Sequence, residues 1–290
     1  MTVYAHSQEE ADKIKQRIED DYASAANPGM FSVGHSENTK MSLDVQLPAD
    51  VALQISNNRG DIHIRDRNSS VSITTQRGDI VVENMKGDLT VQSGGRGTNL
   101  TARQITGNVS ASGRFEDLNA SELTGAITLE GDFFGDMKLQ KIDKGVRFHS
   151  SRTELQLAKV DGEMTMSSGD LQMTSVGGPV RVITRAKDVH LQRVSGDIDV
   201  ENQNGSVEIE PESPVGNVRV QNSRGSIEFA APANSGFVLQ ARADRGEISS
   251  DLDVQIKEER DNHSAEGTVG KGGNRVVLTA DRGSINLRRQ

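Results

Sequence analysis

The chain of 290 residues contains no cysteine and no tryptophan, and it has only 2 tyrosines and 7 phenylalanines. The missing cysteines exclude a disulfide framework and any zinc site built from thiolates. With so few aromatic rings, a core has to be built from Val, Ile, Leu and Met. Sugar-binding sites usually need aromatic platforms, so the sequence also argues against a strong lectin.

Basic tracts and long apolar runs are missing as well. The net charge is -9 with acidic and basic residues interspersed, so we expect no nucleic-acid partner. No run of 18 apolar residues is present, and residues 1–6 do not form a signal peptide, so we expect the chain itself to be soluble. A hydrophobic content of 33% and a mean hydropathy of -0.55 are low for a thick globular core. They favour a thin, elongated body.

A short motif recurs every nine or ten residues along most of the chain. It consists of Gly-Asp, an apolar residue, one variable residue and a second apolar residue. Clear copies are Gly60-Asp61-Ile62-His63-Ile64, Gly78-Asp79-Ile80-Val81-Val82, Gly87-Asp88-Leu89-Thr90-Val91 and Gly196-Asp197-Ile198-Asp199-Val200. This spacing leaves room for one strand of about five residues and one turn. A fixed period of this kind is typical of stacked repeat architectures.

Each repeat supplies two apolar residues that flank a residue that is usually polar. The pairs predicted to point inward are Ile62/Ile64, Ile80/Val82, Val109/Ala111, Ile127/Leu129, Met137/Leu139, Leu155/Leu157, Met164/Met166, Val180/Val182, Ile198/Val200, Val207/Ile209, Val218/Val220 and Ile227/Phe229. Such short strands bury these pairs only by stacking coil upon coil. The prediction is an all-β, single-chain β-solenoid of the parallel β-helix type, with two or three strands per coil and residues 18 to 30 apart stacked on each other.

Antiparallel hairpins are the structural alternative, because the same spacing suits a meander. The scarcity of Asn-Gly and Asp-Gly turns argues against them, with Asn204-Gly205 as one candidate. We predict two segments: a short N-terminal helix and lead-in over residues 1–40, and one continuous repeat domain over 41–290. The helix should run from Ser7 to about Tyr22. Strands are expected at Met41–Leu47 and Val51–Ile55, and a polar surface loop or hairpin at Asp251–Gly273.

Together these features resemble the bacterial putative-adhesin family of β-strand repeats, a domain of unknown function. The resemblance covers nearly the whole chain. It rests on the Gly-Asp-Ile-x-Val repeats, on the early helix with the strands that follow it, and on the ending Leu278-Thr279-Ala280-Asp281-Arg282-Gly283-Ser284-Ile285. It implies an elongated β-helix-like domain in the cell envelope, on the periplasmic or extracellular side. It also implies a membrane link only through an anchor that this chain lacks, and it carries no catalytic residues.

Repeated Asp residues are the first candidates for a site. Asp61, Asp79, Asp88, Asp136, Asp170 and Asp197 recur at one position of the repeat, and an aligned acidic column could hold Ca²⁺. Carboxylates that are solvated or that cap turns are the better interpretation, because the strict calcium-binding nonapeptide pattern is absent. The Arg59-Gly60-Asp61 and Arg77-Gly78-Asp79 tripeptides match an integrin ligand. We interpret them as corners of the repeat.

Enzymatic signals are weak. Glu130, Asp132 and Asp136 lie near Lys138, beside a local irregularity at Phe133 and Phe134, and polysaccharide-cleaving β-helices use such clusters. The six histidines have no metal-binding spacing. The stretch from Gly267 to Gly273 resembles a phosphate loop only superficially, and a hairpin turn accounts for it better. We therefore predict no catalytic residues, no cofactor site and no metal site.

The predicted function is a non-enzymatic, adhesin-like scaffold of the cell envelope that presents a surface to an unknown envelope protein or glycan. The alternatives are a β-helix enzyme that acts on polysaccharide and a scaffold that assembles with itself through open coil ends.

Overall fold

The computed structural model describes residues 12, 13, 16 and 45–290, and all structural statements below concern these residues. The chain divides into two compact units, Met1–Pro48 and Ala49–Gln290. Within the predicted helix Ser7–Tyr22, residues 12, 13 and 16 are helical, and the other residues lie outside the described part. No helix in the described part is long and apolar enough to cross a membrane.

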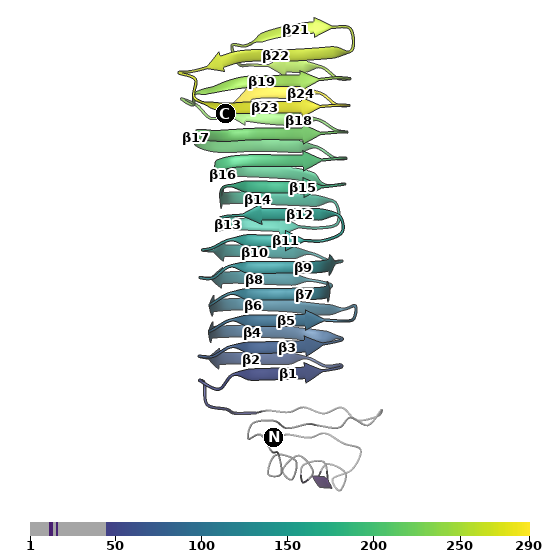
Figure 1. Ribbon diagram of the computed structural model, residues 1–290, viewed down its shortest axis with the longest axis vertical. Helices are drawn as coiled ribbons and strands as arrows, with labels where there is room; N and C mark the ends of the chain where they lie inside the picture. The colour runs from purple at the N-terminus through teal and green to yellow at the C-terminus, as the bar shows by residue number, and fades with distance from the viewer. Residues whose placement is uncertain (1–11, 14–15, 17–44) are drawn as a thin grey trace. The chain divides into compact units, whose positions relative to one another are not determined.

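The second unit is a β-solenoid in which the strands form two faces, so the predicted all-β class is confirmed (Figure 1). Face A contains, in stacking order, β1 (Leu53–Asn57), β3 (Val71–Thr75), β5 (Leu89–Ser93), β7 (Val109–Phe115), β9 (Ile127–Phe133), β11 (Val146–His149), β12 (Thr153–Leu157), β15 (Val180–Thr184), the second halves of β16 (Asp188–Asn202) and β17 (Val207–Asn222), β23 (Asn274–Ala280), β19 (Phe237–Ala243), β22 (Asn262–Val269) and β21 (Gln255–Glu259).

Face B is built in the same way from the strands between these. It contains β2 (Ile62–Arg67), β4 (Gly78–Lys86), β6 (Thr98–Thr106), β8 (Leu118–Leu123), β10 (Met137–Ile142), β13 (Lys159–Met166), β14 (Asp170–Gly177), the first halves of β16 and β17, β18 (Ile227–Ala231), β24 (Ile285–Arg289) and β20 (Ile248–Ser250).

One coil therefore has two strands, which decides between the two and three strands allowed by the sequence. Asp79 bonds to Asp61, 18 residues earlier, and Asn108 bonds to Asp88, 20 residues earlier. We call the turns that lead from face A to face B the A-to-B corner and those that lead back the B-to-A corner. Every predicted inward pair is buried, from Ile62 and Ile64 to Ile227 and Phe229.

Face B strands bend at a residue with left-handed backbone, and a third apolar side chain follows the bend. Asn84 and Gln104 have φ values of 52° and 55°, and the fully buried side chains after them are Met85 and Ile105. The equivalent third inward position of face A is small or polar, as at Thr75 and Ser93, which are also buried. The two corners therefore differ, with an apolar filling at the end of face B and a polar one at the end of face A.

The stack is not parallel throughout, and this corrects the sequence prediction. β12 and β13 run antiparallel to both of their neighbours, so one coil is reversed, as the arrow of β12 shows in Figure 1. The chain reverses through two serine turns rather than through Asn-Gly. Ser150 Oγ accepts the N–H of Thr153 at 3.1 Å, and Ser167 Oγ accepts the N–H of Asp170 at 3.2 Å. A serine hydroxyl can close a tight turn in this way, so the scarcity of Asn-Gly and Asp-Gly did not exclude hairpins.

The predicted hairpin within Asp251–Gly273 is confirmed, since β21 and β22 pair antiparallel. Asn204-Gly205 is a corner of the coil between β16 and β17, which are parallel, so it is not a hairpin. The turn within Gly267–Gly273 does not join paired strands either, because β22 and β23 lie on opposite sides of β19.

The predicted strand at Met41–Leu47 is wrong where it can be judged, and residues 41–44 lie outside the described part. Val45 and Leu47 belong to no strand and are 42% and 37% exposed. β1 begins only at Leu53, and Val51 before it is 44% exposed.

Candidate functional site

The recurring Asp residues cap main-chain N–H groups of the coil above. At the A-to-B corner, Asp61 Oδ1 accepts the N–H of Asp79 at 2.9 Å, and Asp79 Oδ1 accepts the Asn99 side-chain amide at 2.8 Å. The series continues because Asn99 Oδ1 accepts the N–H of Asp117, and Asp117 Oδ1 accepts the N–H of Asp136. These carboxylates replace the ladder hydrogen bonds that a turn interrupts.

The B-to-A corner has a ladder of its own. Asp88 Oδ1 accepts the N–H of Asn108 at 2.8 Å, and Asp197 Oδ1 accepts the N–H of Asn217 at 2.8 Å. Of the six Asp residues singled out in the sequence, five are thus divided between two corners, and Asp170 lies at a hairpin instead. In the part of the chain that the structure describes, no three His, Asp or Glu side chains are grouped closely enough to hold a metal ion.

The two Arg-Gly-Asp tripeptides occupy successive A-to-B corners and bond within the stack. The N–H of Gly60 donates to the carbonyl of Arg77 at 3.2 Å, and Arg77 Nε donates to the carbonyl of Arg96 at 3.3 Å. A Cβ on Gly78, whose φ is 129°, would lie 2.2 Å from the carbonyl oxygen of Gly60. Close stacking of corners therefore accounts for Gly at this position.

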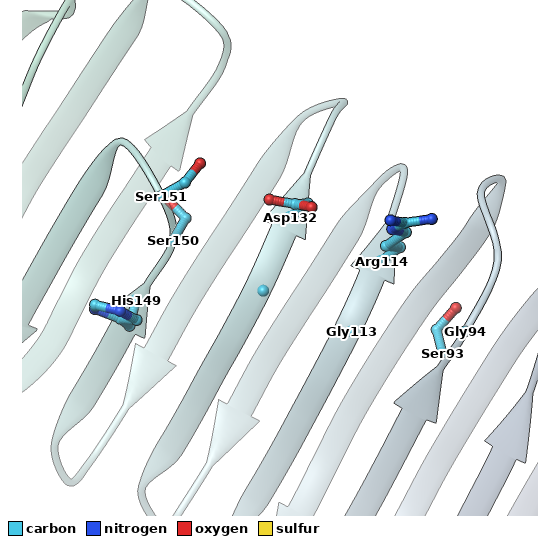
Figure 2. Close-up of a pocket in the computed structure, with 9 residues that line it drawn as sticks. Ser93, Gly94, Gly113, Arg114, Asp132, His149, Ser150 and Ser151 are labelled. Atoms are coloured by element: carbon cyan, nitrogen blue, oxygen red, sulfur yellow. The ribbon is translucent and has the colours of Figure 1, made fainter.

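A shallow groove of about 410 Å³ lies where the strands of face A approach the A-to-B corner. It crosses the ends of β5, β7, β9 and β11. Figure 2 shows Arg114 and Asp132 side by side at its centre, with His149 on one side and Ser93 on the other. The lining residues are Ser93, Gly94, Gly113, Arg114, Gly131, Asp132, His149, Ser150 and Ser151. We refer to these nine residues as the face A groove.

Two glycines make the groove concave. Gly113 and Gly131 occupy inward positions of β7 and β9, with φ values of 112° and 131°, so both strands bend there. A Cβ on Gly131 would lie 2.0 Å from the carbonyl oxygen of Gly113. The floor is therefore main chain packed on main chain, and a rigid floor of this kind preorganises the polar side chains around it.

Behind the groove lies the largest aromatic cluster of the core. Phe115 is fully buried and stacks on Phe133 with ring centroids 5.4 Å apart, and Phe133 contacts Phe148 at 5.1 Å. Each ring neighbours a groove residue in the sequence, since Phe115 follows Arg114 and Phe133 follows Asp132. The polar lining is thus held by rings anchored in the core.

An exposed aromatic ring lies next along the chain. Phe134 directly follows Phe133 and is 43% exposed, and the Arg96 guanidinium lies 5.0 Å from its ring centroid. A guanidinium at this distance is attracted to the face of the ring. This pair and the face A groove offer a ligand both hydrogen-bonding groups and an apolar surface.

The predicted cluster of carboxylates around Lys138 is not assembled. Glu130 and Asp132 lie on β9 of face A, whereas Asp136 precedes β10, and Lys138 lies on β10 of face B. Lys138 pairs instead with Glu163 of β13, at 3.0 Å. The hydrogen bond from Lys138 lowers the pKa of Glu163. Of the predicted enzyme residues, only Asp132 lines the groove.

Of the histidines that the structure describes, His149 lines the groove, whereas His190 bonds to Glu208 of the next coil at 3.0 Å. His63 and His263 lie on β2 and β22, and His6 and His35 lie outside the described residues. The groove itself was missed in the sequence. A signal for it exists, because Gly113-Arg114-Phe115 and Gly131-Asp132-Phe133 repeat the pattern Gly-x-Phe at the length of one coil.

A buried lysine lies above the groove, at the A-to-B corner where both serine hairpins are also found. In the reversed coil the chain does not pass from face A to face B at this corner. Lys187 lies in the turn between β15 and β16 and is 9% exposed. Its Nζ donates to the carbonyl of Ser167 in the second hairpin. Burial lowers the pKa of Lys187, and the charge of Asp170 partly offsets this. The adjacent Asp188 has a lowered pKa because the N–H and the hydroxyl of Ser206 both donate to it.

The chain matches the family described as Toastrack DUF4097 over residues 6–288. Searches of curated proteins and of solved structures found no match. The match supports the resemblance to a family of β-repeat domains of unknown function.

Proposed function

We propose that this chain, which belongs to the Toastrack DUF4097 family, is a non-enzymatic scaffold of the cell envelope whose face A groove binds a glycan. One observation carries this proposal. Arg114, Asp132, His149 and Ser151 line the groove over a rigid glycine floor that stacked coils hold in place. This supplies charged and neutral donors and acceptors in fixed positions, which hydroxyl-rich ligands require.

The neighbouring Phe134 supports a glycan over a purely polar ligand, because a sugar ring needs an apolar surface as well as hydrogen bonds. The adhesin-like role and the envelope location follow from the sequence resemblance. An envelope protein is the alternative ligand of the same groove, and it predicts that none of the purified polysaccharides binds there.

The test is direct binding of the full chain to purified envelope polysaccharides, compared with Arg114→Ala and Asp132→Ala. Loss of a hydrogen bond to a charged group costs about 1.5–3 kcal/mol, so we expect affinity to fall about 10- to 100-fold in each variant. Arg147→Ala is the matched control, since Arg147 is an exposed arginine of β11 that does not line the groove. Equal affinity of all four proteins for every polysaccharide would refute the groove as the glycan site.

The enzymatic alternative retains one supporting feature. Glu130 and Asp132 are two residues apart on β9, which places both on the same strand at a separation of about 7 Å. Two carboxyl groups at such a separation can cleave glycosidic bonds. During the binding experiment, an enzyme would release reducing ends from the polysaccharide, and Asp132→Ala and Glu130→Ala would lose this release. Such a result would favour the enzymatic function over the scaffold.

A further inference from the structure

The last coil of the chain is not the last coil of the stack. β19 and β20 follow β18 in the sequence, yet β23 lies between β17 and β19, and β24 lies between β18 and β20. Figure 1 shows the yellow strands β23 and β24 below β22 and among green strands of earlier residues. We call residues 274–290 the C-terminal coil and the position that it fills the slot. The slot stays open until residues 274–290 have been made.

The strands and corners on either side of the slot do not select one particular sequence. The corners on both sides and the corner that enters between them are nearly the same tetrapeptide: Arg224-Gly225-Ser226-Ile227 below, Arg282-Gly283-Ser284-Ile285 within, and Arg245-Gly246-Glu247-Ile248 above. Their glycines stack directly, because a Cβ on Gly283 would meet the carbonyl of Gly225, and a Cβ on Gly246 would meet that of Gly283. Any copy of this coil fits the slot equally well.

An empty slot is costly. The C-terminal coil pairs its main chain on both sides, and its inward side chains are fully buried; they are Val276, Leu278, Ala280, Ile285 and Leu287. Without it, four strand edges and the apolar residues opposite these side chains would face water. The slot therefore has to be filled by a coil of the same kind.

A clasp of ion pairs holds the end of the coil. Arg288 Nη2 lies 2.8 Å from a Glu208 oxygen and 3.0 Å from a Glu210 oxygen, and Arg288 Nε lies 2.6 Å from a Glu228 oxygen. These side chains are 25% to 37% exposed, so the clasp is accessible to water. These ion pairs add to the strand pairing and the buried side chains that hold the coil in place.

Residues 270–273 form the covalent link between the coil and the strands that precede it in the sequence. Residues 270–273 cross over β19, whose Phe237 pairs with Val269 on one side and Asn274 on the other. Gly270, Gly272 and Gly273 have positive φ values, so glycine permits this sharp crossing and other conformations as well. Fully extended, the link spans about 17 Å from Val269 to Asn274.

We propose that two copies of this chain bind each other by exchanging their C-terminal coils, each coil filling the slot of its partner. The exchange restores every buried contact and every strand pairing of the single chain, and it is reciprocal, so it closes into a two-fold dimer. The reach of the glycine link requires the two molecules to meet at the B-to-A corner near Gly270–Gly273. The dimer would present two copies of the face A groove, although the exchange does not depend on the function proposed for that groove.

The test uses single cysteines in a chain that has none. Gln221 of β17 and Thr279 of β23 are directly paired, and neighbouring strands lie about 4.8 Å apart, within reach of a disulfide. Full-length Gln221→Cys and Thr279→Cys chains are mixed at high concentration, taken through reversible partial unfolding or incubated without denaturant, and then oxidised. A disulfide between the two chains in excess of the collisional background requires the coil of one to lie in the slot of the other.

We expect at least ten times more mixed dimer from this pair than from Gln221→Cys with Thr128→Cys. Thr128 is the matched control, because it is a half-buried threonine of face A, on β9, far from the slot. A chain carrying both Gln221→Cys and Thr279→Cys, oxidised as a monomer beforehand, should form no exchanged dimer. Gln240→Cys with Val277→Cys repeats the test on the other side of the slot.

The clasp gives a second readout. Arg288→Ala should accelerate the appearance of mixed dimer several-fold, whereas Arg289→Ala, an exposed neighbour outside the clasp, should leave the rate unchanged. A yield from both slot pairs no higher than that of the control pair, under native conditions and after refolding, would overturn the proposal. Glycan binding by the monomer would be unaffected by that result.

Discussion

The aromatic cluster behind the face A groove gives the sharpest test of how core and site are coupled. Phe115→Ala removes a fully buried ring that stacks on Phe133 with centroids 5.4 Å apart. A buried Phe→Ala change costs about 3–5 kcal/mol, and a stacked aromatic pair contributes about 0.5–1.5 kcal/mol beyond its area. Against a total of about 5–15 kcal/mol for a typical domain, we expect a loss near the upper end of the first range.

The position of the loss matters as much as its size. In a stack of coils, each coil contacts mainly its neighbours, so the damage should stay local. Hydrogen exchange followed by mass spectrometry should show reduced protection in β5, β7, β9 and β11, and unchanged protection in β17 and β18. Since Phe115 directly follows Arg114, the variant should also lose affinity for any ligand of the groove.

Phe229→Ala is the matched control. Phe229 is fully buried and contacts Phe237 edge to face, with centroids 5.7 Å apart, but it lies in β18 away from the groove. It should destabilise the chain by a similar amount and leave ligand binding at the groove intact. If urea denaturation showed a loss below about 1 kcal/mol for Phe115→Ala, or if both variants lowered protection over the whole stack, the argument from stacked coils would be wrong.

Three further predictions concern the corners. Asp88→Ala should lower the free energy of unfolding in urea by about 1 kcal/mol, because the N–H of Asn108 loses its acceptor, whereas Asp88→Asn keeps the acceptor and most of the stability. Lys187→Met should change the pH dependence of the free energy of unfolding. Because the lowered pKa of Lys187 means that the fold disfavours its charged form, wild-type stability should rise with pH up to about 10.5, while the variant stays flat over that range. Equal slopes of stability against pH in the two proteins would contradict the burial of Lys187 near Ser167. The lowered pKa of Asp188 predicts an effect in acid: as the pH falls below 3.8, the wild type should lose more stability than Asp188→Asn, as acid titration of the unfolding free energy would show.

The candidate site was only partly accessible from the sequence. Asp61, Asp88 and Asp197 were correctly interpreted as turn caps, because a carboxylate after a corner glycine has a main-chain N–H within reach where coils stack. The groove was missed, since its residues come from four strands and the repeated Gly-x-Phe pattern at Gly113 and Gly131 does not by itself show that these strands lie side by side. Only the positive φ of Gly113 and Gly131 bends these strands into a concave surface.

The sequence alone determined the inward pairs and the solenoid class, because alternation along a strand is a local property that any partner strand preserves. Tertiary structure decided which strand pairs with which: the two strands in each coil, the reversed coil of β12 and β13, and the place of β23 and β24 inside the stack. The reason is degeneracy. Corners such as Arg224-Gly225-Ser226 and Arg282-Gly283-Ser284 offer nearly identical edges, so their order depends on how the whole chain buries its strands.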